Sequence, residues 1–206
     1  MTTFASGWFG TDLGPYRQCR GTYDLFPAES LPPLPALDGS FGWLPVVPGD
    51  GLDYMDPVPD LTLDPINATL PPSFVSFMDR PERRAAIPSC TACYWSVSAA
   101  VPSPVGDGAH LVRFLNDQQD VLLWHLYLRP DGGHEVVCGG IPYDSYHATA
   151  EQTRADLVSV APGFEEFMYR FWVENLAWFQ LNELGRPFAQ LDPAVRDYLS
   201  HYNGGD

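Results

Sequence analysis

Two cysteines in the run Cys90-Thr91-Ala92-Cys93 have a type and spacing that could do chemistry. A C-x-x-C pair occurs in structural zinc sites and in thioredoxin-like redox sites. A structural zinc site needs four ligands, and the nearest candidates, His134 and Cys138, do not supply a second pair at a recognisable spacing. A redox pair would open a helix after a strand, whereas this pair leads into a predicted strand. We therefore interpret both cysteines as small buried residues, with metal or redox use as the alternative.

The histidines could act as general bases if a nucleophile lay within reach. A pair of His134 and Cys138 would share one face of a strand, but the strand rise places them about 13 Å apart, too far for proton transfer. His125 follows Trp124 in a largely apolar run, so it is interpreted as a core residue. The remaining histidines are His110, His147 and His201.

Paired carboxylates could form an acid–base couple at Glu165-Glu166 or at Asp117 and Asp120. Adjacent acids in the first turn of a helix are also what the helix dipole favours, and that interpretation is preferred for Glu165-Glu166. The chain has no G-x-S-x-G, P-loop, G-x-G-x-x-G or H-E-x-x-H motif. The sequence therefore predicts no catalytic residue, no cofactor site, no metal site and no enzymatic activity.

Charge is the strongest global signal of the 206-residue chain, because 26 acids oppose 11 bases and give a net charge of −15. Such a charge disfavours nucleic acid and anionic membranes as partners and favours a basic protein. The alternative is that the acidic surface serves only solubility. No export signal or membrane-length apolar run is visible, so a cytoplasmic location is expected.

Residues 1–69 differ in composition from the rest, with ten of the 21 prolines and nine acids. Proline at this density argues against long helices and interior strands. Recurrent aromatic residues argue against disorder. We expect a turn-rich acidic extension packed on a main domain of residues 70–206, with a short helix near residues 3–11 as an option.

The main domain combines helices and strands. A helix capped by Ser73 is expected after Leu70 and should end at Asp79-Arg80-Pro81. Strands are expected at 93–101, 110–115, 121–128 and 134–138, and helices at 150–158, 162–184 and after Asp192-Pro193. In the helix at 162–184 the aromatic residues form one apolar stripe, and Glu165, Glu166, Arg170 and Glu174 are expected to be turned away from it. The third strand is apolar on both faces and should be central. The fold class is thus a single α+β domain with a mostly antiparallel sheet of about four to six strands packed by helices.

Three segments resemble the SUKH superfamily, which contains the yeast Smi–Knr cell-wall regulators and many bacterial immunity proteins. Its opening helix is similar to Leu70-Pro71-Pro72-Ser73-Phe74-Val75-Ser76-Phe77, and its closing helix to Phe164–Trp172. Its central sheet looks like the strands around Phe114–Gln119 and Trp124–Leu128. The resemblance covers about residues 68–184 and lies mostly at core positions. The loop Asn116–Asp120, the Pro162-Gly163 pair and the proline-rich extension depart from the family pattern.

The resemblance implies a non-catalytic protein-binding module, in bacteria an immunity protein that neutralises a cognate toxin by stoichiometric binding. An acidic immunity protein suits a basic toxin domain such as a nuclease. The alternative is a regulatory or scaffold protein that binds a cellular partner. Charge places the predicted contact residues in the extension and two loops: Asp50, Asp53, Asp56, Asp60, Asp117, Asp120 and Asp131. The sequence gives no indication of oligomeric state.

Overall fold

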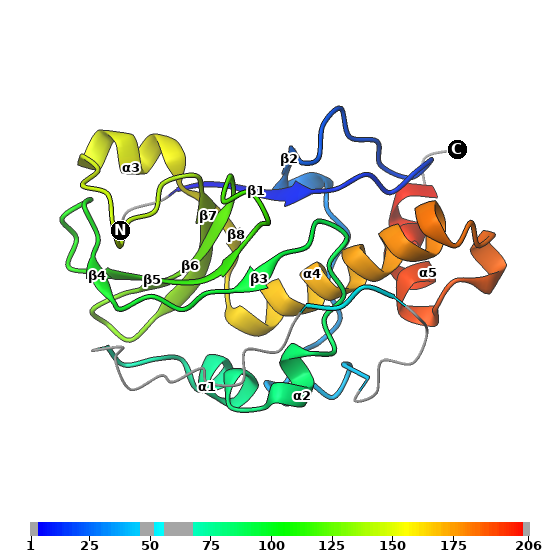
Figure 1. Cartoon of the computed structure of the whole chain (residues 1–206), viewed down its shortest axis with the longest axis horizontal. Helices are drawn as coiled ribbons and strands as arrows, with labels where there is room; N and C mark the ends of the chain where they lie inside the picture. The colour runs from blue at the N-terminus through cyan, green and yellow to red at the C-terminus, as the bar shows by residue number, and fades with distance from the viewer. Residues whose placement is uncertain (1–3, 46–51, 56–67, 204–206) are drawn as a thin grey trace.

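The computed structural model describes residues 4–45, 52–55 and 68–203, in which eight strands form one mixed sheet (Figure 1). The sheet order is β2-β1-β8-β7-β6-β5-β3, and β4 also pairs with β5. The strands are β1 (Ala5–Gly10), β2 (Asp24–Pro27), β3 (Tyr94–Trp95), β4 (Val101–Pro102), β5 (His110–Asn116), β6 (Leu123–Leu128), β7 (His134–Gly139) and β8 (Val158–Ala161). The α+β class is confirmed, with more strands than predicted.

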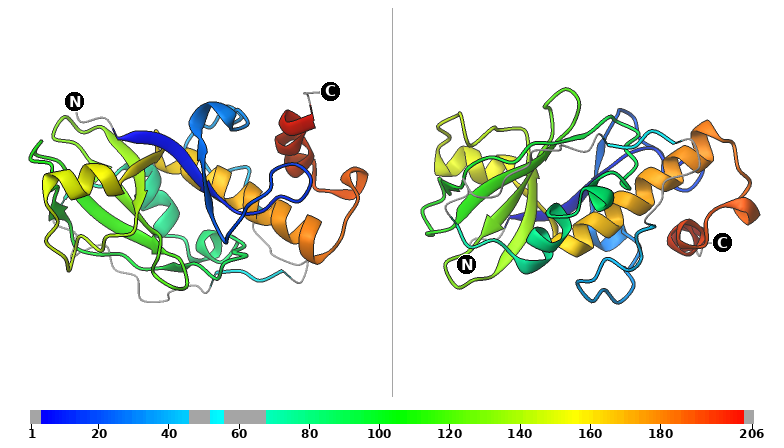
Figure 2. Two further views of the ribbon diagram at one scale, coloured as in Figure 1. Left: turned by 90° about the horizontal axis from the view of Figure 1, so that it is seen from above. Right: turned by 60° about the horizontal axis from the view of Figure 1, so that its bottom comes forward.

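The helices are α1 (Pro72–Met78), α2 (Pro81–Arg84), α3 (Ala150–Asp156), α4 (Phe164–Trp178) and α5 (Pro193–Ser200). Shorter turns are η1 (Ala28–Ser30), η2 (Phe179–Glu183), η3 (Phe188–Gln190) and η4 (His201–Asn203). The figures place α3 and α5 at opposite ends of the molecule, with α4 running between them (Figure 2). No described helix is both long enough and apolar enough to span a membrane.

The strands β5, β6 and β7 form an antiparallel meander, as the sequence predicts. Every residue of β6 is buried, so its central position is confirmed. Trp124 and Leu126 point into the large core under α4, and Tyr127 points into a smaller core on the other face. The β6–β7 turn uses Gly132 with φ of +85°, a conformation that glycine adopts without strain.

The strand predicted at 93–101 is wrong in its length. It is reduced to β3 and β4, which both pair with β5. Between them the backbone still follows β5, because the amides of Ser96 and Ser98 donate to the carbonyls of Phe114 and Arg113. A register shift in the β5–β6 pairing lies between Arg113 and Leu115. A bulge in the neighbouring strand disrupts a regular ladder and explains the interruption.

The prediction against interior strands in the extension is also wrong at its start. β1 lies between β2 and β8, antiparallel to the first and parallel to the second. The first proline of the chain is Pro15, so the average proline content of residues 1–69 concealed a proline-free start. Trp8 packs in the main core from this strand. The same strand replaces the helix considered near residues 3–11.

The helix predicted at 150–158 ends earlier, at Asp156, and β8 follows directly. The N-terminus of α3 has a capping box, in which Thr149 and Gln152 each bond the other's backbone amide. In β8 the side chains of Val158 and Val160 are buried and Ser159 lies between them, which is the alternation of a strand. β8 connects the meander to β1 and so brings the extension into the sheet.

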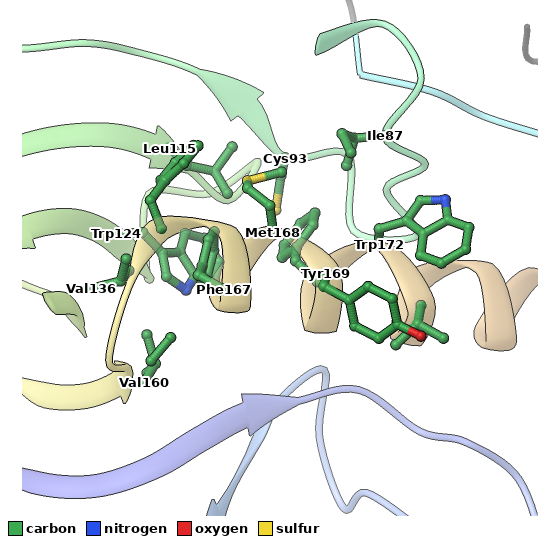
Figure 3. Packing of buried hydrophobic residues seen from close by; sticks show 14 of the residues in the cluster. Ile87, Cys93, Leu115, Trp124, Val136, Val160, Phe167, Met168, Tyr169 and Trp172 are labelled. Atoms are coloured by element: carbon green, nitrogen blue, oxygen red, sulfur yellow. The ribbon is translucent and has the colours of Figure 1, made fainter. Parts of the chain in front are cut away.

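The large core lies between the sheet and α4 (Figure 3). Phe164 is fully buried and makes edge-on contacts with Phe74 of α1 and Phe114 of β5 at centroid distances of 4.9 and 5.4 Å. Phe167 stacks at a tilt near Trp124 of β6. These are geometries that aromatic rings prefer, so the aromatic stripe of α4 holds α1 and the sheet together.

The charged residues of α4 are not turned to solvent as the helical pattern predicted. Glu165, Arg170 and Glu174 are buried. Residues 31–44 of the extension cover the outer face of α4, and Trp43 packs on Tyr169 and Trp172. A helix covered all round needs internal partners for its charges, and the extension supplies them.

The helix ends follow local sequence signals in part. Asp192 caps α5 through a bond from the Ala194 amide, with Pro193 at the first helical position, as predicted. The cap predicted at Ser73 is wrong, because α1 begins at Pro72, and Pro71, two residues earlier than Ser73, occupies the cap position. Proline at the first turn has no amide hydrogen to satisfy there, so no side-chain cap is needed for it.

Candidate functional site

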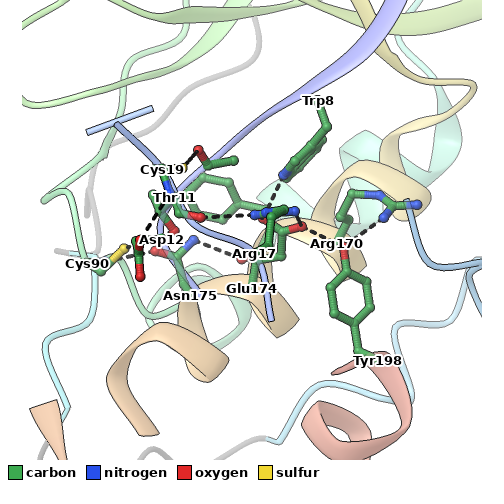
Figure 4. A network of polar contacts seen from close by, with 12 residues as sticks. Trp8, Thr11, Asp12, Arg17, Cys19, Cys90, Arg170, Glu174, Asn175 and Tyr198 are labelled. Atoms are coloured by element: carbon green, nitrogen blue, oxygen red, sulfur yellow. Dashed lines mark hydrogen bonds and ion pairs between the residues drawn. The ribbon is translucent and has the colours of Figure 1, made fainter. Parts of the chain in front are cut away.

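A buried network around the Arg17–Glu174 ion pair joins the N-terminal segment and α5 to α4 (Figure 4). The carboxylate of Glu174 accepts two 2.6 Å hydrogen bonds from Arg17, one of 2.7 Å from Trp8 Nε1 and one of 2.5 Å from the Tyr198 hydroxyl. Burial alone would raise the pKa of Glu174, but Arg17 and the other donors outweigh it, and the pKa is lowered. Both oxygens of the Glu174 carboxylate are occupied by hydrogen bonds within the protein, so we interpret this group as one that stabilises the fold and not as a reactive one.

The cysteines of the C-x-x-C pair have protonated thiols. Burial raises the pKa of Cys90 to about 12 and also raises that of Cys93. A thiolate is required both for metal binding and for thiol exchange. Among the described residues, no group of three or more His, Cys, Asp or Glu could hold a metal ion.

Two cavities with charged or histidine side chains in their lining lie near the end of the meander that carries the β6–β7 turn. The first, of about 670 Å³, contains His110, Arg129 and His134. The second, of about 330 Å³, contains His134, Arg129, Glu135, Ser159 and Arg170. Arg129 and the Ser159 hydroxyl both donate to Glu135, so both oxygens of the Glu135 carboxylate already accept hydrogen bonds. His134 Nε2 is buried without a hydrogen-bond partner in the described part of the chain, so no nucleophile–base pair is assembled there.

His125 is a buried core residue, as predicted. Its ring lies edge-on to Tyr143 at 5.6 Å between centroids. Burial, with a contribution from Arg113, lowers the pKa of His125 to about 3. A histidine that stays neutral and enclosed has no access to a substrate, and its effect is on stability.

The structure describes four of the seven acids predicted to contact a partner. Asp50, Asp56 and Asp60 lie outside the described residues. Asp53, Asp120 and Asp131 are exposed, whereas only 4% of Asp117 is exposed. The Asp117 carboxylate accepts the amides of Val121 and Leu122, so it shapes the β5–β6 loop and offers little surface.

The four acids do not form one surface. Asp117 and Asp120 follow the end of β5, while Asp131 lies in the turn at the other end of β6. Six strand residues at the usual rise separate these ends by about 20 Å. Asp53 lies with the first end, because it lines a cavity with Tyr94, and Tyr94 in turn contacts Asp120.

At this first end the structure brings together a group we call the Tyr94 surface: Asp53, Tyr94, Asp120, Val121, Trp178 and Glu183. Tyr94 is 39% exposed and Val121 is 55% exposed. The Tyr94 hydroxyl donates to Asp120 Oδ1 at 2.7 Å and accepts from Asn116 Nδ2 at 3.2 Å. An exposed aromatic side chain is thus held in one orientation by Asp120, and the exposed Val121 follows Asp120 in the chain.

Backbone strain is concentrated at the same place. The described non-glycine residues with positive φ are Phe41, Ala92 and Asp120. Asp120 bonds Tyr94, and Ala92 lines the cavity that Tyr94 lines. Residues in the left-handed region cost energy and persist where the surroundings impose them, often at binding sites. Two of three such residues therefore belong to or adjoin the Tyr94 surface.

Sequence reasoning identified Asp53 and Asp120 but missed Glu183 and the apolar members of this surface. Tyr94 was assigned to a predicted strand, and Trp178 to the apolar stripe of the long helix. Neither assignment distinguishes a buried aromatic residue from an exposed one. The signal that could have found Tyr94 is its alternation with Trp95, since successive strand residues face opposite sides and Trp95 is buried.

Comparison of the chain with protein-family models, with curated proteins and with solved structures finds no significant match. The resemblance to the SUKH superfamily consequently rests on the residues quoted for it.

Proposed function

We propose that this chain is a non-catalytic module that binds a basic protein partner through the Tyr94 surface. The observation that carries the proposal is the exposed ring of Tyr94, fixed by hydrogen bonds to Asp120 and Asn116. Tyrosine and tryptophan are enriched at interface hot spots, where a rigid aromatic group loses little entropy on binding. Trp178 adds apolar area to the cavity that Tyr94 lines, and Asp53 and Glu183 add negative charge there. Val121, which follows Asp120, adds exposed apolar area.

The net charge of −15 supports a basic partner. Opposite charge accelerates encounter and disfavours acidic competitors. With the SUKH resemblance, this charge favours an immunity protein of the bacterial cytoplasm that neutralises a cognate toxin, such as a nuclease, by stoichiometric binding. The second candidate is a regulatory or scaffold protein of the same superfamily, which would use the same surface on a cellular partner.

The first test is capture of the partner from the host with the tagged full-length chain, followed by mass spectrometry. We expect one basic protein in stoichiometric amount. The Tyr94→Ala variant should lose that protein, and Tyr146→Ala should retain it. Tyr146 is the matched control because it is 51% exposed and lies in the connection between β7 and α3. Equal capture by all three proteins would contradict the proposed surface.

A second test separates the two candidates. The captured partner is expressed in a heterologous host with and without this chain. An immunity protein should restore growth when the partner is toxic, and Tyr94→Ala should restore it less. A partner that is harmless by itself would favour the regulatory candidate and contradict immunity.

A further inference from the structure

A cavity of about 360 Å³ opens under the Tyr94 surface, between the segment 52–55, the turn that carries the C-x-x-C pair, and the junction of α4 with η2. We propose that this cavity receives an arginine side chain that the partner presents. The inference rests on the proposed function and specifies the chemistry that the Tyr94 surface recognises.

The lining of the cavity has the two features that a guanidinium group needs. Tyr94 and Trp178 supply aromatic groups, and Asp53 and Glu183 supply carboxylates. Guanidinium groups stack on aromatic faces and form paired hydrogen bonds with carboxylates. The apolar residue Met55 also lines the cavity and offers a surface for the methylene stem.

The charge of this cavity is negative. Among the described residues, its lining holds Asp53 and Glu183 but no arginine or histidine. Three further cavities among the described residues each contain at least one arginine: Arg129 in two of them, and Arg80 with Arg83 in one of about 230 Å³. A cation therefore meets a favourable field here and a competing cation in the others.

The backbone adds to this field. The Leu184 amide donates to the Phe179 carbonyl, five residues back, so the long helix ends in a wide π-type turn that carries Glu183. Such turns occur often at functional sites, and the carbonyl end of a helix attracts cations. Across the cavity, the Ser89 amide donates to the Asp53 carbonyl and the Met55 amide to Ile87, which anchors the other acid.

The test is a titration of the isotope-labelled full chain with two capped tripeptides, Gly-Arg-Gly and its citrulline counterpart, followed by NMR. Citrulline keeps the shape of arginine and lacks its charge. We expect the arginine peptide to shift the Trp178 indole signal and the amides near Asp53 and Glu183. The citrulline peptide should bind at least about tenfold more weakly. The Asp53→Asn/Glu183→Gln variant should show the same loss, and Asp131→Asn should not.

Equal affinity for the two peptides, or shifts that avoid the cavity, would overturn the inference. If the protein does not distinguish the two peptides but Tyr94→Ala fails to capture the partner, the cavity assignment is wrong and the proposed function stands. Selective arginine binding together with unchanged partner capture by Tyr94→Ala would overturn the proposed function and leave the cavity assignment. The peptide comparison on the unmodified protein does not depend on the folding of any variant.

Discussion

The hydroxyl of Tyr94 donates a 2.7 Å hydrogen bond to Oδ1 of Asp120, a residue held at φ of +56°. Asn116 Nδ2 donates to the same carboxylate at 2.7 Å. A strained turn residue thereby orients an aromatic ring that belongs to another strand. This contact also raises the pKa of Tyr94 and lowers that of Asp120, because the hydrogen bond favours the protonated phenol and the ionised carboxylate.

The backbone conformation of Asp120 leads to the first prediction. Asp120→Ala should lower the free energy of unfolding by about 1 kcal/mol, because alanine tolerates the left-handed region poorly and accepts no hydrogen bond. Asp120→Asn keeps an acceptor and tolerates that region, so its effect should stay within about 0.5 kcal/mol. Urea unfolding of both variants measures the difference. Equal losses would show that the conformation at Asp120 carries no strain.

Ala92 allows the opposite experiment, since its φ is +50° and it has no side-chain hydrogen bond to lose. Ala92→Gly should raise the free energy of unfolding by about 0.5–1 kcal/mol through relief of strain, after the entropy of glycine is subtracted. Ala155→Gly is the control, because Ala155 is an exposed residue of α3 and glycine should cost about 0.5–1 kcal/mol there. Destabilisation by both substitutions would contradict the strain at Ala92.

The β5–β7 meander and the helices α4 and α5 could be predicted from sequence because local signals determine them. Gly132 marks the tight turn, and Asp192-Pro193 marks a helix start. The partners of Glu165 could not be predicted. Its carboxylate accepts from the amides of Gly39 and Phe41 and from Trp43 Nε1, and those residues are more than 120 positions away. Helical periodicity assigns a glutamate to solvent when nothing local covers it.

The candidate site, like the fold, could be predicted only in part. Charge predicted Asp53, in the extension, and Asp120, in a loop, as contact residues. The proximity of these two acids depends on Tyr94, which links the β5–β6 loop to the cavity that Asp53 lines. Sequence patterns report on one element at a time, whereas this surface is assembled from segments distant in the chain.

The Arg17–Glu174 pair leads to a prediction on cooperativity. Glu174→Leu should lower the free energy of unfolding by roughly 3–5 kcal/mol, because it leaves Arg17 buried without its counter-charge. Removal of both charges in Arg17→Met/Glu174→Leu should cost clearly less than the sum of the single changes. Urea unfolding of the wild type, Arg17→Met, Glu174→Leu and the double variant completes the double-mutant cycle. Additive losses would show that the two side chains are not coupled.

The same pair predicts sensitivity to acid. The pKa of Glu174 is lowered in the folded state, so its stabilising effect is present above the unfolded value of about 4.3 and is lost as the pH falls below it. We expect the wild-type protein to lose stability from about pH 4 downward. The Arg17→Met/Glu174→Leu variant should show a shallower loss over this range. Thermal unfolding between pH 5 and pH 3 provides the comparison, and parallel curves would exclude Glu174 as a source.

His125 predicts a second pH dependence at milder acidity. Its folded pKa of about 3 lies below the unfolded value of about 6.5, so between these values the unfolded chain binds a proton that the folded chain does not. The contribution of neutral His125 to the free energy of unfolding is therefore fully present above about pH 6.5. Below that pH, the free energy of unfolding should fall by up to about 1.4 kcal/mol per pH unit. His125→Phe keeps a ring against Tyr143 and should flatten the curve between pH 7 and pH 5. His147→Gln, at an exposed position, should retain the slope. Urea midpoints at several pH values decide the matter: an unchanged slope in His125→Phe would assign the effect to another group.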